Sequence, residues 1–165
     1  MPSKYGVVSK AFTAKASAKD PDAILDLYIL TQDLNGNLAK SSDSIKNNLK
    51  SYVNQYRMIG DSVNIKDAFI VNIGCEFDII TLPNYNNNEI LTQCIGAVQT
   101  YFQTRKWQIN QPIILRELTI LLDAVSGVQT VANIQIINKA GTNNGYSEYA
   151  YSIPGATQGG VIYPS

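Results

Sequence analysis

Acidic residues at two places have a spacing that could support chemistry. Asp33-Leu34-Asn35-Gly36-Asn37 resembles the opening of a calcium-binding loop, in which side-chain oxygens at alternate positions coordinate the ion. Such a loop ends on a bidentate glutamate at its twelfth position, and Ser44 stands there. We therefore interpret 33–37 as a turn, because Asn and Gly tolerate the positive φ that a tight turn needs.

Glu76 and Asp78 are two residues apart, a spacing that places both carboxylates on one face of a strand. Paired carboxylates can act as acid and base when their environments push the two pKa values apart. The same spacing is typical of residues that a half-buried strand displays to solvent. We favour this second interpretation and expect no catalysis at the pair.

Most other site chemistry is excluded by residue types. The chain has no histidine, which removes Ser-His-Asp and Cys-His catalysis and histidine zinc sites. Cys75 and Cys94 are too few for a four-thiolate zinc site, and their apolar surroundings indicate small buried hydrophobes. Gly159-Gly160 does not follow a strand and open a helix as a phosphate loop does. We expect no catalytic, cofactor-binding or metal-binding residues, and no enzyme.

The charge balance bears on partners. Thirteen Lys and Arg balance thirteen Asp and Glu, whereas nucleic-acid and anionic-membrane binders concentrate positive charge. The basic spot beside an aromatic residue, Arg105-Lys106-Trp107, is typical of a helix C-terminus. No run approaches the roughly 20 apolar residues of a membrane span. We expect neither nucleic acid nor membrane as a partner, and the low charge leaves little repulsion against self-association.

The hydrophobic periodicity predicts an α+β fold with an antiparallel or mixed sheet and about three helices packed on it. Residues 1–40 read as a β-rich entry, 41–140 as helix and strand units, and 141–165 as an irregular tail rich in Gly, Asn and Tyr. Within the predicted α+β module, 1–140, strands are expected at 5–14, 24–31, 68–81 and 128–138, with a loop at 14–21. Helices are expected from Ser41 or Ser42 to Gly60, from Asn86 to Phe102, and from 115 to Gly127.

Each element has a predicted core face, and Asn86 with Glu89 forms a predicted capping box. On the helices the apolar stripes are Ile45, Leu49, Tyr52, Val53 and Tyr56, then Leu91, Cys94, Ile95, Val98 and Phe102, then Leu115, Leu118, Leu122 and Val125. On the strands the inward residues are Phe69, Val71, Ile73, Cys75, Phe77 and Ile79, then Ala132, Ile134 and Ile136.

Tyrosines gather in the tail, at Tyr146, Tyr149, Tyr151 and Tyr163, among small polar residues. Tyrosine buries a large area at a low entropic cost and keeps a polar tip, which suits protein interfaces. A tail packed on its own domain would show the same composition. The sequence leaves both interpretations open.

An ordered set of segments resembles a known family, the C-terminal part of the baseplate wedge protein of T-even-like contractile-tailed bacteriophages, which is related to the baseplate J-like proteins. The segments that carry the resemblance are 4–11 (KYGVVSKA), 27–30 (LYIL), 49–58 (LKSYVNQYRM), 65–74 (IKDAFIVNIG), 107–113 (WQINQPI), 124–128 (AVSGV), 155–157 (GAT) and 160–165 (GVIYPS). They cover most of the chain in register, and none is a catalytic signature.

The resemblance implies a virion structural protein of the tail baseplate, assembled in the host cytoplasm. Copies of the wedge protein join neighbouring wedges into a ring around the tail hub, so the implied partners are other wedge proteins and the chain itself. Family members are much longer, and we expect this chain to be a fragment. The family has no catalytic residues to carry over.

We expect a homodimer at micromolar concentration, with an interface of roughly 1,200–2,000 Å². One alternative is a carbohydrate- or receptor-binding virion module that uses exposed aromatic residues, which glycan-array binding would reveal. A second is a hydrolase that uses Asp and Glu without histidine, which turnover of a chromogenic substrate panel would reveal.

Overall fold

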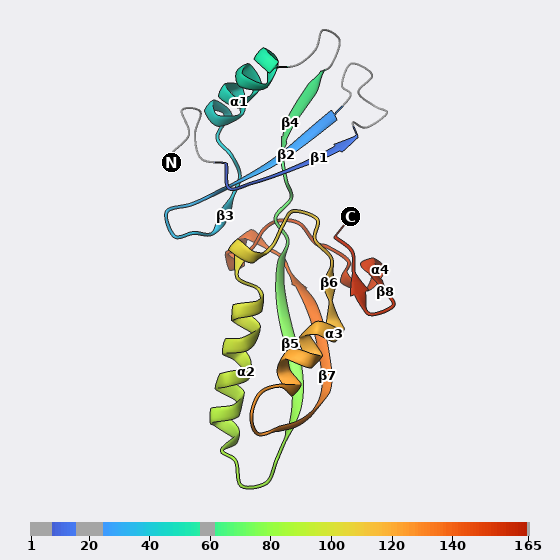
Figure 1. Ribbon diagram of the computed structural model, residues 1–165. Coiled ribbons are helices and arrows are strands. Elements are labelled where there is room, and N and C mark those ends of the chain that lie inside the picture. The colour runs from blue at the N-terminus through green and yellow to red at the C-terminus, as the bar shows by residue number, and fades with distance from the viewer. Residues whose placement is uncertain (1–7, 16–24, 57–61, 165) are drawn as a thin grey trace. The chain divides into compact units, whose positions relative to one another are not determined.

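The computed structural model describes residues 8–15, 25–56 and 62–164, which form helices and strands in two compact units (Figure 1). The units are Met1–Ile70 and Val71–Ser165. The predicted α+β class is confirmed. The predicted division into 1–140 and 141–165 stays a prediction. Residues 5–7, Ile24, the predicted loop beyond Lys15 and the predicted helix stop at Gly60 lie outside the described residues.

The first unit holds a mixed sheet built around one central strand. Its elements are β1 (Lys10–Lys15), β2 (Leu25–Gln32), β3 (Leu38–Ala39), α1 (Asp43–Tyr56) and β4 (Val63–Asp67). Strand β2 pairs antiparallel with β1 and parallel with β4, and its last two residues pair with β3. The β-formers of β2 explain its central place, since Ile29, Leu30 and Thr31 are buried there.

Helix α1 lies in the crossover between the parallel strands β2 and β4. Its inner stripe is narrower than predicted: Ile45, Leu49 and Val53 are half-buried, whereas Tyr52 and Tyr56 are exposed. The two tyrosine rings contact each other at a centroid distance of 4.9 Å. The prediction that both rings lie in the core was therefore wrong. The side chains at 45, 49 and 53 lie one turn apart on one face of α1, and this row alone forms the inner face of the helix.

The second unit is built on a long two-stranded antiparallel ribbon, β5 (Asn72–Thr81) with β7 (Val128–Lys139). The other elements are α2 (Asn87–Tyr101), η1 (Thr104–Lys106), β6 (Ile113–Ile114), α3 (Leu115–Asp123), η2 (Thr142–Asn144), α4 (Ile153–Ala156), β8 (Thr157–Gln158) and β9 (Val161–Ile162). Strands β6, β9 and β8 form a small antiparallel sheet.

Both long helices of this unit pack on the same face of the ribbon. Ile90, Cys94 and Val98 of α2 share a buried cluster with Leu122 of α3, and half-buried residues of the ribbon, Phe77 among them, pack against it. A second buried cluster joins Leu118 of α3 to Ile136, Ile153 and Ile162. The predicted stripe of α3 is confirmed at Leu118 and Leu122, which are fully buried.

The predicted strand over 68–81 is wrong at its start. Residues 63–67 form β4, which pairs with β2, and a separate strand begins at Asn72 and pairs with β7. The predicted core residue Phe69 lies between the two strands and is 65% exposed. Alternation of apolar and polar residues indicates a strand but does not identify the strand with which it pairs. The same alternation can therefore continue while the chain passes from one sheet to another.

The predicted inner face of the last strand is corrected at its start. A register shift in the β5–β7 pairing falls between Asp78 and Ile79, and Val131 pairs with Ile79 while Ala132 has no partner. Val131 consequently packs on the core and Ala132 is exposed, whereas Ile134 and Ile136 face inward as predicted. A β-bulge inserts one extra residue and so reverses the alternation on one side of it.

Asn86 caps α2 as predicted, because its side chain accepts a hydrogen bond from the backbone N–H of Asn88 at 3.1 Å. The second half of the predicted capping box, a hydrogen bond from the Asn86 backbone N–H to the Glu89 side chain, is absent from the described part of the chain. Two of the five residues in the predicted apolar stripe of α2 are exposed, and the prediction is wrong for these two. Ile90, Cys94 and Val98 form the buried row, while Leu91 and Ile95 are 43% and 42% exposed. Residues at i and i+1 differ by about 100° around a helix, so Leu91 and Ile95 lie on the flank of the buried row.

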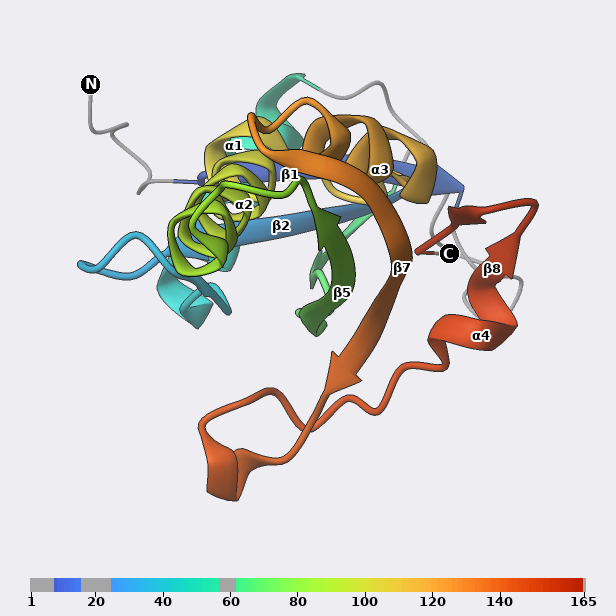
Figure 2. The ribbon, with the colours of Figure 1, turned by 90° about the horizontal axis from the view of Figure 1, so that it is seen from below.

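The C-terminal segment is irregular over 145–152 and then becomes part of the fold. Figures 1 and 2 show α4 and β8 on the β7 side of the ribbon and α2 on its β5 side. Ile153 of α4 and Ile162 of β9 are buried with Ile136 of β7. The segment therefore contributes to the core of the second unit.

Candidate interaction surfaces

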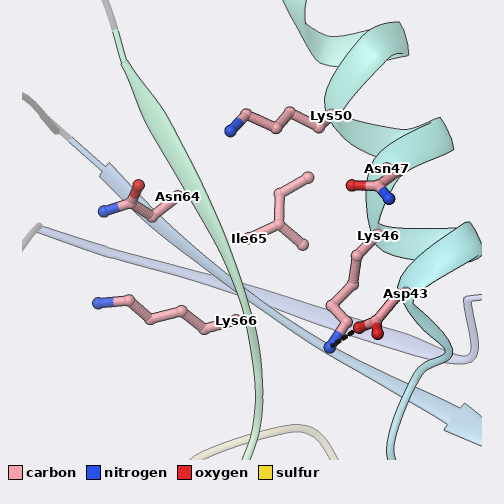
Figure 3. Close-up of a pocket in the computed structure, with 7 residues that line it drawn as sticks. All are labelled: Asp43, Lys46, Asn47, Lys50, Asn64, Ile65 and Lys66. Carbon is pink, nitrogen blue, oxygen red and sulfur yellow. Dashed lines mark ion pairs between the residues drawn. The ribbon is translucent and has the colours of Figure 1, made fainter.

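A charged groove of about 590 Å³ lies in the first unit between α1 and β4 (Figure 3). The residues that line it are Asp43, Lys46, Asn47, Lys50, Asn64, Ile65 and Lys66. Figure 3 shows the ammonium groups of Lys50 and Lys66 extending away from the Lys46–Asp43 ion pair. Three lysines around one groove raise the question of an anion-binding site.

Carboxylates balance these lysines. The Lys46 ammonium lies 3.0 Å from an Asp67 oxygen and 3.1 Å from an Asp43 oxygen, and Lys66 lies 2.9 Å from Asp26. The hydrogen bonds to Asp67 and then Asp43 raise the pKa of Lys46. With three aspartates beside three lysines, the local charge is near zero. The pairs tie α1 to β4 and β4 to β2, which is a structural role and gives no charge for an anion.

Asp33 forms the predicted turn. One of its carboxylate oxygens accepts hydrogen bonds from the backbone N–H groups of Asn35 and Asn37, each at 2.8 Å, and the other accepts from the Asn37 side chain. The backbone hydrogen bond from Asn37 is the main reason that the pKa of Asp33 is lowered. Gly36 has a φ of +83°, as expected for its place in the turn.

Glu76 and Asp78 lie exposed on the face of the ribbon opposite the helices. A Glu76 oxygen accepts a hydrogen bond of 2.7 Å from the Gln135 side chain on the paired strand. Both carboxylates are exposed, as expected of side chains that a half-buried strand displays to solvent. Among residues 8–15, 25–56 and 62–164, no three His, Cys, Asp or Glu side chains group as a metal site would require.

The basic residues near Trp107 close the end of α2. The Lys106 ammonium bonds the Thr100 carbonyl at 3.1 Å, in the last turn of that helix, as predicted. Arg105 bonds the Gln103 side chain. The indole ring of Trp107 stacks on Phe102 at 5.5 Å. The basic residues at 105 and 106 therefore have a structural role at the C-terminal end of α2.

Both cysteines are free thiols that pack in the core of the second unit, Cys94 fully buried and Cys75 half-buried. Burial raises the pKa of both thiols, which keeps them protonated and inert at neutral pH. The interpretation as small hydrophobes is confirmed.

The tail tyrosines pack largely on their own unit. The Tyr151 hydroxyl donates a hydrogen bond of 2.7 Å to the Tyr163 carbonyl, which joins the two ends of the C-terminal segment. Lys139 lies over the Tyr146 ring at 5.8 Å. Of the two interpretations left open by the sequence, packing on the same domain describes Tyr151 and Tyr146, while the Tyr163 ring is exposed.

An apolar groove of about 270 Å³ lies in the second unit between α2 and β5. The residues that line it are Ile73, Cys75, Phe77, Ile95, Val98, Gln99 and Phe102, none of them charged. Sequence reasoning missed this surface, because it assigned Ile95 to the core. The available signal was the width of the apolar stripe on α2, which exceeds what one row of core contacts needs.

The fold of this chain has a similarity to a known structure, whereas its sequence matches no known family. No protein-family model matches the chain, and no curated protein sequence matches it. The described part of the chain holds no helix long and apolar enough to cross a membrane. One solved structure with a similar fold is a chain of the anti-feeding prophage baseplate, determined by electron cryo-microscopy with six-fold symmetry. The similarity has a TM-score of 0.56 at 10% sequence identity and covers 74% of this chain and 27% of that chain. The fold of most of this chain is therefore similar to that of a part, about a quarter, of a baseplate chain.

Proposed function

We propose that this chain is a virion structural protein, a baseplate wedge component of a contractile phage tail. It acts through protein–protein contacts in a ring assembly, without catalysis or cofactor, and its place is the tail baseplate, assembled in the host cytoplasm. The likeness of its fold to a chain of the anti-feeding prophage baseplate carries this proposal. The ordered segments that resemble the wedge family point the same way.

The surface of the second unit supports a role in protein contacts. Its groove between α2 and β5 is uncharged, and Leu91 and Ile95 beside it remain exposed. Protein interfaces bury apolar patches of this kind. The groove offers no catalytic side chains to a small substrate.

A second copy of the chain and other wedge proteins are the proposed partners, rather than nucleic acid or a membrane. The formal charge of zero leaves little repulsion between copies. Gel filtration coupled to light scattering tests the homodimer, whose mass is twice 18.1 kDa. A mass that stays at 18.1 kDa up to about millimolar protein contradicts self-association, since contacts of about −4 kcal/mol would show there.

The dimer surface is proposed to lie outside the tail. Deletion of 141–165 cannot test this, because it removes the buried residues Ile153 and Ile162 and would open the core. Tyr163→Ser changes an exposed ring while the backbone carbonyl that Tyr151 bonds stays in place. A dimer that survives Tyr163→Ser supports the proposal, and a dimer that this substitution abolishes assigns the interface to the tail.

A further inference from the structure

Strand β5 has an edge that no other strand occupies. Within the described residues β5 pairs only with β7, so alternate backbone N–H and C=O groups along its other side have no strand partner. The pairing with β7 is regular from Asn72 to Asp78 and shifts only after Asp78. A regular, unpaired edge of this kind is a template for an added strand.

The apolar groove runs along this same edge. Its lining residues on β5 are Ile73, Cys75 and Phe77, which alternate along the regular part of the strand, and the others come from α2 and its C-cap. A strand added beside β5 would place every second side chain against α2, over this groove. Ile95, 42% exposed at the groove, would contact those side chains.

The opposite face of β5 carries negative charge. Glu76 and Asp78 point there, and neither carboxylate forms an ion pair within the described part of the chain. The lysine of the paired strand, Lys139, lies at the far end, against Gly74 and the Tyr146 ring. The remaining side chains of an added strand would therefore lie next to two carboxylates.

We infer that β5 accepts an extended segment of a partner protein as an added strand, with apolar side chains toward α2 and Lys or Arg side chains toward Glu76 and Asp78. The groove selects the first set, and charge complementarity selects the second. This inference rests on the proposed function, because it names the chemistry of one neighbour in the assembly.

A second copy of the chain fits this edge less well. Antiparallel pairing of β5 with its own copy centred on Phe77 would place Glu76 opposite Asp78, and pairing centred on Glu76 would place the two Glu76 side chains opposite each other. Like charges directly opposite each other destabilise a strand pair. Charge complementarity therefore favours a different, basic segment as the occupant.

Synthetic peptides test the inference on the full chain. The probe is a capped peptide of about eight residues, close to the usual length of a strand, in which Val and Lys alternate. One control peptide holds the same residues with all valines before all lysines, and a second alternates Val with Glu. The single tryptophan, Trp107, reports binding by fluorescence, because it stacks on Phe102, which lines the groove. Hydrogen exchange of the amides at 72–78 reports strand formation.

The alternating Lys peptide should bind at least about tenfold more tightly than either control and should slow exchange at 72–78. Ile95→Glu should weaken its binding about tenfold, whereas the same change at Ile120, 58% exposed on α3, should leave binding within about twofold. Asp78→Lys should abolish most of the preference for the alternating Lys peptide over the alternating Glu peptide, because the new ammonium offsets the Glu76 carboxylate. Circular dichroism of each variant confirms that it is folded.

Equal binding of the alternating and block peptides would overturn the inference, because charge alone would then explain the affinity. Unchanged amide exchange at 72–78 on the unsubstituted chain would overturn it whatever the variants do. A dimer abolished by Ile95→Glu and kept by Ile120→Glu would assign the edge to a second copy and contradict the inference as well. All three results leave the proposed function standing, since that function is tested by the chain's presence in tail particles.

Discussion

The carboxylate of Asp26, 2% exposed, lies 2.9 Å from the ammonium of Lys66 across the parallel strands β2 and β4. The two residues are 40 positions apart, and the pair joins the strands that flank the α1 crossover. A charge buried to this degree is tolerated because it is paired.

Lys66→Met should therefore lower the free energy of unfolding by about 2–3 kcal/mol, because it removes the Lys66 ammonium from beside the buried Asp26 carboxylate. Lys50→Met is the matched control: Lys50 lines the same groove but is exposed, and its loss should cost under about 0.5 kcal/mol. Urea denaturation measures both. Equal effects of the two substitutions would mean that the Asp26–Lys66 pair contributes no stability.

Phe77→Ala should destabilise the second unit by about 2–4 kcal/mol, since the ring is half-buried against the cluster formed by α2, α3 and the ribbon. Glu76→Ala, one residue away on the exposed face, loses a hydrogen bond to Gln135 and should cost under about 1 kcal/mol. Chemical denaturation of the two variants compares the faces directly. A loss at Glu76 as large as that at Phe77 would refute the assignment of faces.

Ionisation of the Tyr101 hydroxyl should lower the free energy of unfolding in alkaline solution. Burial first, and then the hydrogen bond to Glu117, raise the pKa of Tyr101 from 10.0 to about 12. Below pH 10 the folded and unfolded chains both keep this proton, so the contribution is complete there. As the pH rises from 10 to about 12 the unfolded chain loses the proton first, and the contribution is lost.

Tyr101→Phe should remove that part of the alkaline fall, as seen in denaturation midpoints measured across the range. Glu117→Gln should reduce it only in part, because burial is the larger cause of the raised pKa. A pH profile that Tyr101→Phe leaves unchanged would show that the pKa of this hydroxyl is not raised.

Gly127 is required where α3 turns into β7. Its φ is +94°, and a Cβ there would lie 2.7 Å from both the Ile90 Cδ1 and a ring carbon of Tyr85. Gly127→Ala should thus lower the melting temperature more than Gly36→Ala does, since Gly36 has a φ of +83° but open space around it. We expect about 1–2 kcal/mol for the backbone strain at either glycine, with the clash added only at Gly127. Equal melting temperatures for the two variants would contradict this packing.

Local patterns predicted the elements that depend on nearby residues. The Asp33 turn, the Asn86 cap and the α3 stripe each rest on interactions within a few positions, and all are present. The break before Asn72 and the bulge at Ala132 were missed, because both depend on which distant strand is the partner. Alternation along one strand carries no information about that choice.

The apolar groove between α2 and β5 could not be predicted from the sequence, for a related reason. Ile95 and Cys94 are adjacent apolar residues in one helix, yet one borders an open groove and the other is fully buried. Only the position of β5 under α2 distinguishes them. The tail shows the converse case, since the composition of 141–165 suggested an irregular arm while Ile153 and Ile162 complete a core cluster.

Electron cryo-microscopy of the tail particles that carry this sequence tests the central claim most directly. The account predicts density for this fold in several copies around the tail axis, each in contact with neighbouring baseplate subunits. Particles whose baseplate density is fully explained by other proteins, with this chain absent from them by mass spectrometry, would contradict it.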